Sequence, residues 1–165
     1  MLQTVFVMSI FPSIFMIHEM EEIIYFKKFG KVSHHYHLPK SIIKINRRIT
    51  SLSTTKFASV VFEEFILLLL ISFLCLYIKN KTTSLIYAGF MSAYNIHIIF
   101  HILQSIYLKK YVPGLVGGII SFFITCILIN LIWNFNIVHF ILMTIFCLIF
   151  IIINLWVCYY LSLKN

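Results

Sequence analysis

The sequence contains no aspartate, and its acidic residues are five glutamates in a chain of 165 residues. Only 11% of the residues are charged, whereas 61% are apolar and the mean hydropathy is +1.00. A soluble domain is about 45–50% apolar and about 25% charged. The composition therefore excludes an ordinary soluble domain and predicts an integral membrane protein.

Several reactive motifs are also missing. The sequence has no glycine-rich phosphate loop and no GxSxG element, and a Ser/His/Asp set is impossible without aspartate. Its four cysteines fall inside apolar segments with no CxxC spacing, so a disulfide framework is not expected. Any chemistry must come mainly from glutamate and histidine.

Apolar segments long enough to cross a bilayer dominate the chain. A spanning helix needs about 20 mainly apolar residues. We therefore predict an all-α, polytopic transmembrane helix bundle that forms a single integral membrane domain over residues 1–165. Its five spans cover roughly residues 2–20, 57–78, 83–108, 112–133 and 137–161.

The main hydrophilic stretch lies between the first two predicted spans. Within it, residues 41–52 carry isoleucine and leucine at spacings of three and four, with Lys44, Arg47 and Arg48 opposite. This pattern predicts a basic amphipathic helix lying on an anionic membrane surface, although a solvated loop helix fits it as well. Because the basic residues fall between apolar runs, the net charge of +8 points to membrane orientation rather than to nucleic acid.

The distribution of cations predicts the topology. Eleven lysines and arginines fall on one side of the five predicted spans and two on the other. By the positive-inside rule, the N-terminus is outside the cell and the C-terminus is cytoplasmic. The abundance of Ile, Phe, Lys and Asn favours an AT-rich, bacterial genome, and hence a multi-pass protein of the bacterial cell membrane.

Histidines and glutamates recur near the same end of the first three spans. His18, Glu21 and Glu22 have i, i+3, i+4 spacing, and His97 and His101 have i, i+4 spacing, so each group shares one helix face. By a rise of 1.5 Å per residue, the glutamates of the second span lie roughly 10 Å inside the membrane, and His101 lies at about 12 Å. A charged side chain at that depth is costly, so such residues are functional candidates.

Glutamates and neutral imidazoles on facing helices are ligands for zinc, iron or manganese. The candidate metal ligands are His18, Glu21, Glu22, Glu63, His97 and His101. The candidate general bases are Glu21, Glu22 and Glu64. Two other interpretations stay open: a metal-free carboxylate pair that exchanges protons with histidine, and side chains that pair only to hold helices together.

Two sequence motifs carry a family resemblance. The run HEMEE at 18–22 and the run HILQSIYLKKYVPGLV at 101–116 resemble the HXXEE domain family of small multi-pass membrane proteins. The resemblance implies that the family positions are His18, Glu21, Glu22, His101, Tyr111, Pro113 and Gly114. It implies no particular activity.

From these observations we predict an intramembrane Glu/His site near the cytoplasmic leaflet, belonging to a metal-dependent hydrolase or transferase. The depth of the site favours a lipid or lipid-linked substrate, with membrane lipids as partners and a divalent metal as cofactor. The alternative is a small proton-coupled transporter or an accessory membrane protein. A transporter with only five spans would be small unless it forms a homo-oligomer.

Overall fold

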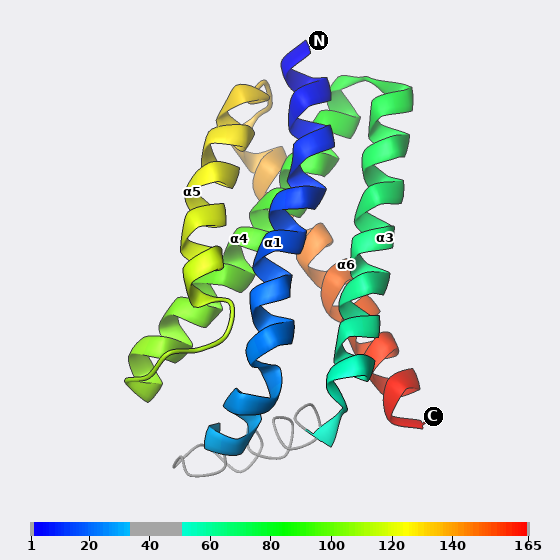
Figure 1. Cartoon of the computed structure of the whole chain (residues 1–165). Helices are drawn as coiled ribbons and strands as arrows, with labels where there is room; N and C mark the ends of the chain where they lie inside the picture. Colours follow the sequence, from blue (N-terminus) through cyan, green and yellow to red (C-terminus); the bar gives the residue numbers. More distant parts are fainter. Residues whose placement is uncertain (1, 34–50, 165) are drawn as a thin grey trace.

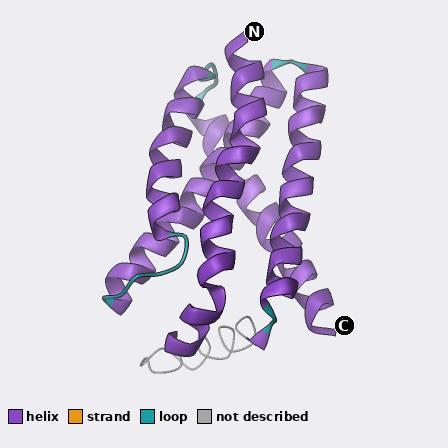
Figure 2. Ribbon diagram, viewed as in Figure 1, coloured by secondary structure: helices purple, strands orange, loops and turns teal. Residues whose placement is uncertain are grey.

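A computed structural model describes residues 2–33 and 51–164, and the secondary structure there is helical (Figure 2). The helices are α1 (Leu2–Ser33), α3 (Thr54–Ile78), α4 (Lys81–Leu108), α5 (Leu115–Leu131) and α6 (Ile137–Lys164). The predicted all-α membrane bundle is thereby confirmed. The predicted amphipathic helix at 41–52 falls mainly on residues 34–50, outside the described part of the chain.

The helices pass up and down through one bundle. In Figure 1, α1 runs down the front between α5 and α3, whereas α4 and α6 lie behind it. The main packing partners are α1 with α3 and α5, and α4 with α5 and α6. The two ends of the chain lie at opposite ends of the bundle (Figure 1).

Four helices, α1, α3, α4 and α6, are long and apolar enough to cross a membrane by length and composition. The fifth, α5, has 17 residues and is shorter than the predicted span at 112–133. The turn at Pro113–Gly114 accounts for the later start, because Gly114 takes a left-handed conformation (φ 80°) immediately before the helix.

Local sequence explains where two neighbouring helices begin and end. Ser53 caps α3 by accepting a hydrogen bond from the amide of Lys56 at 3.1 Å. Asn80 and Thr83 form a reciprocal capping box at the start of α4. Because Lys79 adopts a left-handed conformation between them, the chain reverses within a few residues and lays α4 against α3.

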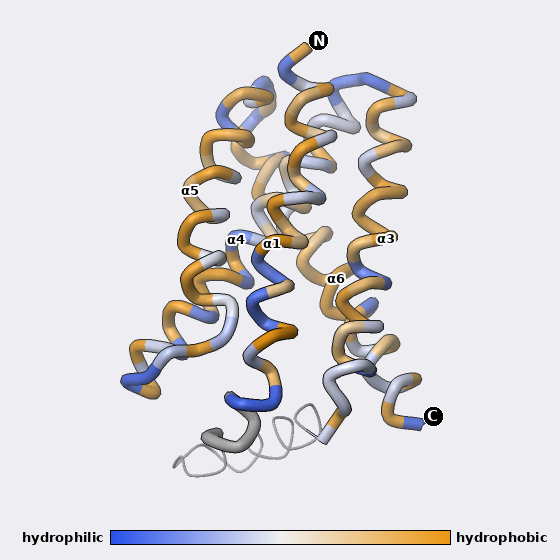
Figure 3. The backbone as a smooth tube through the Cα atoms, in the orientation of Figure 1, coloured by the Kyte–Doolittle hydropathy of each residue, from blue (hydrophilic) through white to orange (hydrophobic). Residues whose placement is uncertain are grey.

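The main apolar core is formed by residues of α1, α3, α4 and α5, in the half of the bundle nearest the N-terminus. Tyr87 is fully buried there, and its hydroxyl donates to the carbonyl of Met8 at 2.9 Å and lies 2.8 Å from the hydroxyl of Ser72. Buried polar groups need such partners. In the other half, hydrophilic segments of α1, α3 and α4 occur within the bundle (Figure 3).

Candidate metal centre

Two helices bring four donor side chains together. His18 and Glu22 come from α1, and His97 and His101 come from α4. One ligand atom from each of the four lies within 4.8 Å of the others. The i, i+4 spacing on both helices places each pair on one face, and the packing of α1 on α4 makes the two faces meet.

A single carboxylate oxygen lies at the middle of this group. Glu22 Oε1 is 3.3 Å from His18 Nε2, 3.5 Å from His97 Nε2 and 2.8 Å from His101 Nε2. The Nε2 atoms of His97 and His101 are 2.9 Å apart. Donors bound to one zinc ion at about 2.0–2.1 Å in a tetrahedron are about 3.3 Å from one another. The separations around Glu22 Oε1 are close to that value, and the four ligand atoms together lie within 4.8 Å.

Unpaired polar atoms at the same place support this fit. Within the described residues, both ring nitrogens of His18, Glu22 Oε1 and His101 Nδ1 are buried and have no hydrogen-bond partner of acceptable geometry. Buried polar atoms are ordinarily satisfied. A cation bound by His18 Nε2 and Glu22 Oε1 would satisfy two of these four atoms.

The donor group is closed on most sides and open on one. The side chain of His18 is 0% exposed, and those of Glu22 and His101 are 14% and 13% exposed. His97, in contrast, is 44% exposed. Catalytic metal sites keep one coordination position free for water or substrate, and this open flank is where such a position would be.

Glu21, the neighbour of Glu22, points to a different helix. Its carboxylate accepts hydrogen bonds from the amides of Val116 (3.3 Å) and Gly117 (2.6 Å) in the first turn of α5, and from the hydroxyl of Tyr111. A carboxylate at a helix N-terminus satisfies free amides and is favoured by the helix dipole. Burial and the Glu21 carboxylate raise the pKa of the Tyr111 phenol, which therefore stays a donor.

Glycines allow α5 to approach the donor group closely. A Cβ on Gly114 would lie 2.7 Å from His18 Cε1 and 2.8 Å from Glu22 Oε1, and the positive φ of Gly114 also disfavours a side chain. A Cβ on Gly118 would lie 3.3 Å from the His18 ring. The first turn of α5 thus packs directly against His18 and Glu22 and covers the donor group on the side that faces α5.

The two glutamates of α3 are held by α6. The Asn154 amide donates to Glu63 Oε2 at 2.9 Å and to Glu64 Oε1 at 2.6 Å, and the thiol of Cys158 donates to Glu63 at 3.1 Å. The structure therefore brings neither Glu63 nor Glu64 into the group of four donors. It places Glu64 in the wall of a cavity that Glu22 and His97 also line.

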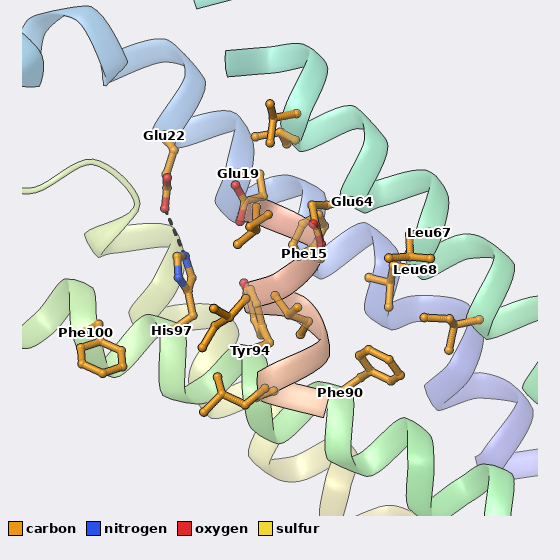
Figure 4. A pocket seen from close by; sticks show the side chains of 18 of the residues that line it. Phe15, Glu19, Glu22, Glu64, Leu67, Leu68, Phe90, Tyr94, His97 and Phe100 are labelled. Carbon is orange, nitrogen blue, oxygen red and sulfur yellow. Dashed lines mark ion pairs between the residues drawn. The ribbon is translucent and has the colours of Figure 1, made fainter. Parts of the chain in front are cut away.

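That cavity has a volume of about 240 Å³ and lies among α1, α3, α4 and α6. Glu22 and His97 contribute to its lining from the donor group, and Glu19 and Glu64 add two further carboxylates (Figure 4). The rest of the lining is almost entirely apolar or aromatic. The open flank of the donor group therefore faces an apolar chamber.

Of the predicted metal ligands, four are brought together: His18, Glu22, His97 and His101. Glu21 and Glu63 are placed outside the group. Glu19 is not among the predicted ligands, because its position next to His18 puts it off the His18–Glu22 face. It is nevertheless only 7% exposed, with Oε1 3.8 Å from His18 Nε2. Its position within a buried apolar run could have identified it.

Comparison with known proteins agrees with the two motifs. Residues 9–129 match the family described as "Protein of unknown function with HXXEE motif". That segment contains all four donors together with Glu21 and the turn before α5. No curated protein and no solved structure matches the chain.

Proposed function

Since the chain belongs to the HXXEE family, whose description names a motif and no activity, we propose a function from the site alone: a metal-dependent membrane enzyme, a hydrolase or transferase that acts on a lipid or lipid-linked substrate. The observation that carries this proposal is the convergence of four donors within 4.8 Å, with their open flank on an apolar cavity.

The four donors and Glu21 have different proposed roles. His18, His97 and His101 supply three imidazoles, and Glu22 supplies the carboxylate that balances part of a divalent charge. A metal held there would polarise a substrate oxygen and lower the pKa of a bound water. Glu21 and the first turn of α5 fix the helix that carries two of these donors, because they tie α1 to α5 on the side away from the cavity.

Glu64 is our candidate for a proton acceptor. Its carboxylate lines the same cavity as Glu22 and His97, and the Asn154 amide holds one of its oxygens in place. A general base must reach the water or hydroxyl that it activates. Glu64 meets this condition for a molecule inside the cavity without being one of the four donors.

The substrate class follows from the surroundings. The four helices that line the cavity, α1, α3, α4 and α6, are all long and apolar enough to cross a membrane. A substrate therefore reaches the donors from within the bilayer or from its surface. The excess of cations on the side where α1 ends favours the cytoplasmic leaflet of a cell membrane. A bond near the lipid headgroups is within reach of such a site.

The test is turnover in liposomes. Purified protein is reconstituted in vesicles of bacterial phospholipid extract, loaded with zinc, manganese or iron(II), and the lipids are analysed by mass spectrometry over time. We expect a metal-dependent product that is lost on chelation and in Glu22→Gln. If the lipids are unchanged with every metal, and a pH-sensitive dye in the same vesicles reports proton movement across the membrane, the transporter alternative is favoured instead.

A further inference from the structure

We propose that the cavity beside the donor group binds the hydrocarbon chain of a single membrane lipid, with the polar end of that lipid at Glu22 and His97. This inference deepens the proposed function and rests on it for the reaction at the polar end. Binding of the chain itself can be measured without turnover.

The first argument is the polarity of the lining. The histidine and glutamate residues of the cavity wall are Glu19 and Glu22 on α1, Glu64 on α3 and His97 on α4 (Figure 4). We call the part of the wall that they form the polar level. Ile71 lies seven residues beyond Glu64, and Phe90 lies seven residues before His97. Both therefore line the cavity roughly 10 Å from the polar level, toward the middle of the bundle.

The wall between the two levels is apolar. It is formed by Leu68 on α3, Ala93 on α4 and Leu148 on α6. Phe57, seven residues before Glu64, and Phe100 line the cavity on the other side of the polar level. A chamber with carboxylates and one imidazole part-way along it, and about 10 Å of apolar wall toward Ile71 and Phe90, matches an amphiphile. A polar solute would leave the apolar part unfilled, and a wholly apolar one would lie against the carboxylates of Glu22 and Glu64 without making a hydrogen bond to them.

The second argument is access. Phe100 on α4 and Ile152 on α6 line the cavity, yet they are 64% and 57% exposed on the outside of the bundle. Toward the end of the bundle where the C-terminus lies, α4 and α6 run to opposite sides in Figure 1. In a membrane these exposed side chains would face lipid, so a chain could enter sideways without crossing water.

The third argument is the presence of a small residue, Ala93, in the wall. Ala93 is 1% exposed and packs in a cluster with Phe90 and Cys147. A phenylalanine at position 93 would project into the chamber and take up the space that a chain needs. Ile99 lies on the same helix, is 41% exposed and does not line the cavity, so Ile99→Phe is the matched control.

The experiment uses photoreactive palmitate with a diazirine near the middle of the chain, about eight carbons from the carboxylate, so that the diazirine lies about 10 Å from the polar level. The probe is incorporated into liposomes together with the full-length protein. Cross-linked residues are then mapped by mass spectrometry. We expect saturable labelling of the wall around Leu68, Ile71 and Phe90, displaced by excess unlabelled palmitate. Labelling of exposed positions such as Leu70 and Phe73 should not saturate and serves as the background.

We expect Ala93→Phe to reduce labelling of the cavity residues about tenfold without changing the amount of bound metal. The control variant Ile99→Phe should be labelled as strongly as the wild-type protein. If Ala93→Phe does not fold, the inference is still tested in the wild-type protein, where excess unlabelled palmitate should displace the photoreactive probe. Labelling confined to the exposed positions, or cavity labelling that does not saturate, would overturn the inference. Bound metal without labelling of the cavity would refute only the site for the hydrocarbon chain. Saturable labelling without bound metal would refute only the proposed metal enzyme.

Discussion

Glu21 and Glu22 are adjacent in the sequence, but their carboxylates contact different helices. Glu21 accepts a hydrogen bond from the Gly117 amide of α5 at 2.6 Å, whereas Glu22 Oε1 lies 2.8 Å from His101 Nε2 of α4. The two consecutive glutamates of the motif thus have separate tasks. One anchors α5 to α1, and the other completes the donor group.

This separation predicts different losses for two matched variants. Glu21→Gln keeps an acceptor but removes the charge at the N-terminus of α5, so it should destabilise the fold by about 1 kcal/mol and keep bound metal. Glu22→Gln should lose metal and change the thermal midpoint little. Thermal unfolding in detergent and metal analysis of the same samples test both. Equal metal loss in the two variants would contradict the division.

Gly114 should tolerate no side chain. Gly114→Ala places a methyl group within 2.7 Å of His18 Cε1 at a position with positive φ, so it should displace the donors and lower both metal content and thermal stability. Gly118→Ala is the graded comparison, since its nearest contacts are 3.2–3.3 Å and a small shift relieves them. A Gly114→Ala protein that retains metal and stability would show that α5 does not press on the site.

Asn154 should matter for folding and not for metal. Asn154→Leu leaves Glu63 and Glu64 side by side without their shared donor, which should cost about 1–3 kcal/mol of stability. Adding Glu63→Gln should restore part of it, because only one carboxylate then remains to be satisfied. The readouts are thermal unfolding and metal content of the single and double variants. Loss of metal in Asn154→Leu would instead connect α6 to the donor group.

The orientation predicted from the cations gives a separate test. With the N-terminus outside and five crossings, a reporter fused after the last residue of α6 should be cytoplasmic. Fusions to alkaline phosphatase and green fluorescent protein report the two sides in opposite ways. Export of the C-terminal reporter would reverse the leaflet assigned to the site, while the contacts among the donors would stand.

The helical architecture and the family could be predicted from the sequence, because long apolar runs and short motifs are local features. The meeting of His18 with His101 was suggested by the same logic, since i, i+4 spacing fixes a face and the rise per residue fixes a depth. The rotation of α3 about its own axis has no such local signal. Sequence alone therefore could not show that Glu63 and Glu64 both point to Asn154.

The role of Glu21 was hidden for a related reason. His18, Glu21 and Glu22 share a face broadly enough that all three looked equivalent as ligands. Which of them meets α4 and which meets α5 depends on where the first turn of α5 packs. That position is set by Gly114 and by close contacts that only the three-dimensional structure displays.

The central claim is a metal ion held by His18, Glu22, His97 and His101, and metal content tests it most directly. Protein purified in detergent, exposed to zinc, manganese or iron(II) and then desalted, should retain about one divalent ion per chain at neutral pH, as a four-donor site implies. The ion should be lost in His101→Ala and kept in His139→Ala, which removes an exposed histidine outside the donor group. Wild-type protein that retains no ion with any of these metals, or a His101→Ala protein that retains as much as the wild type, would contradict the account.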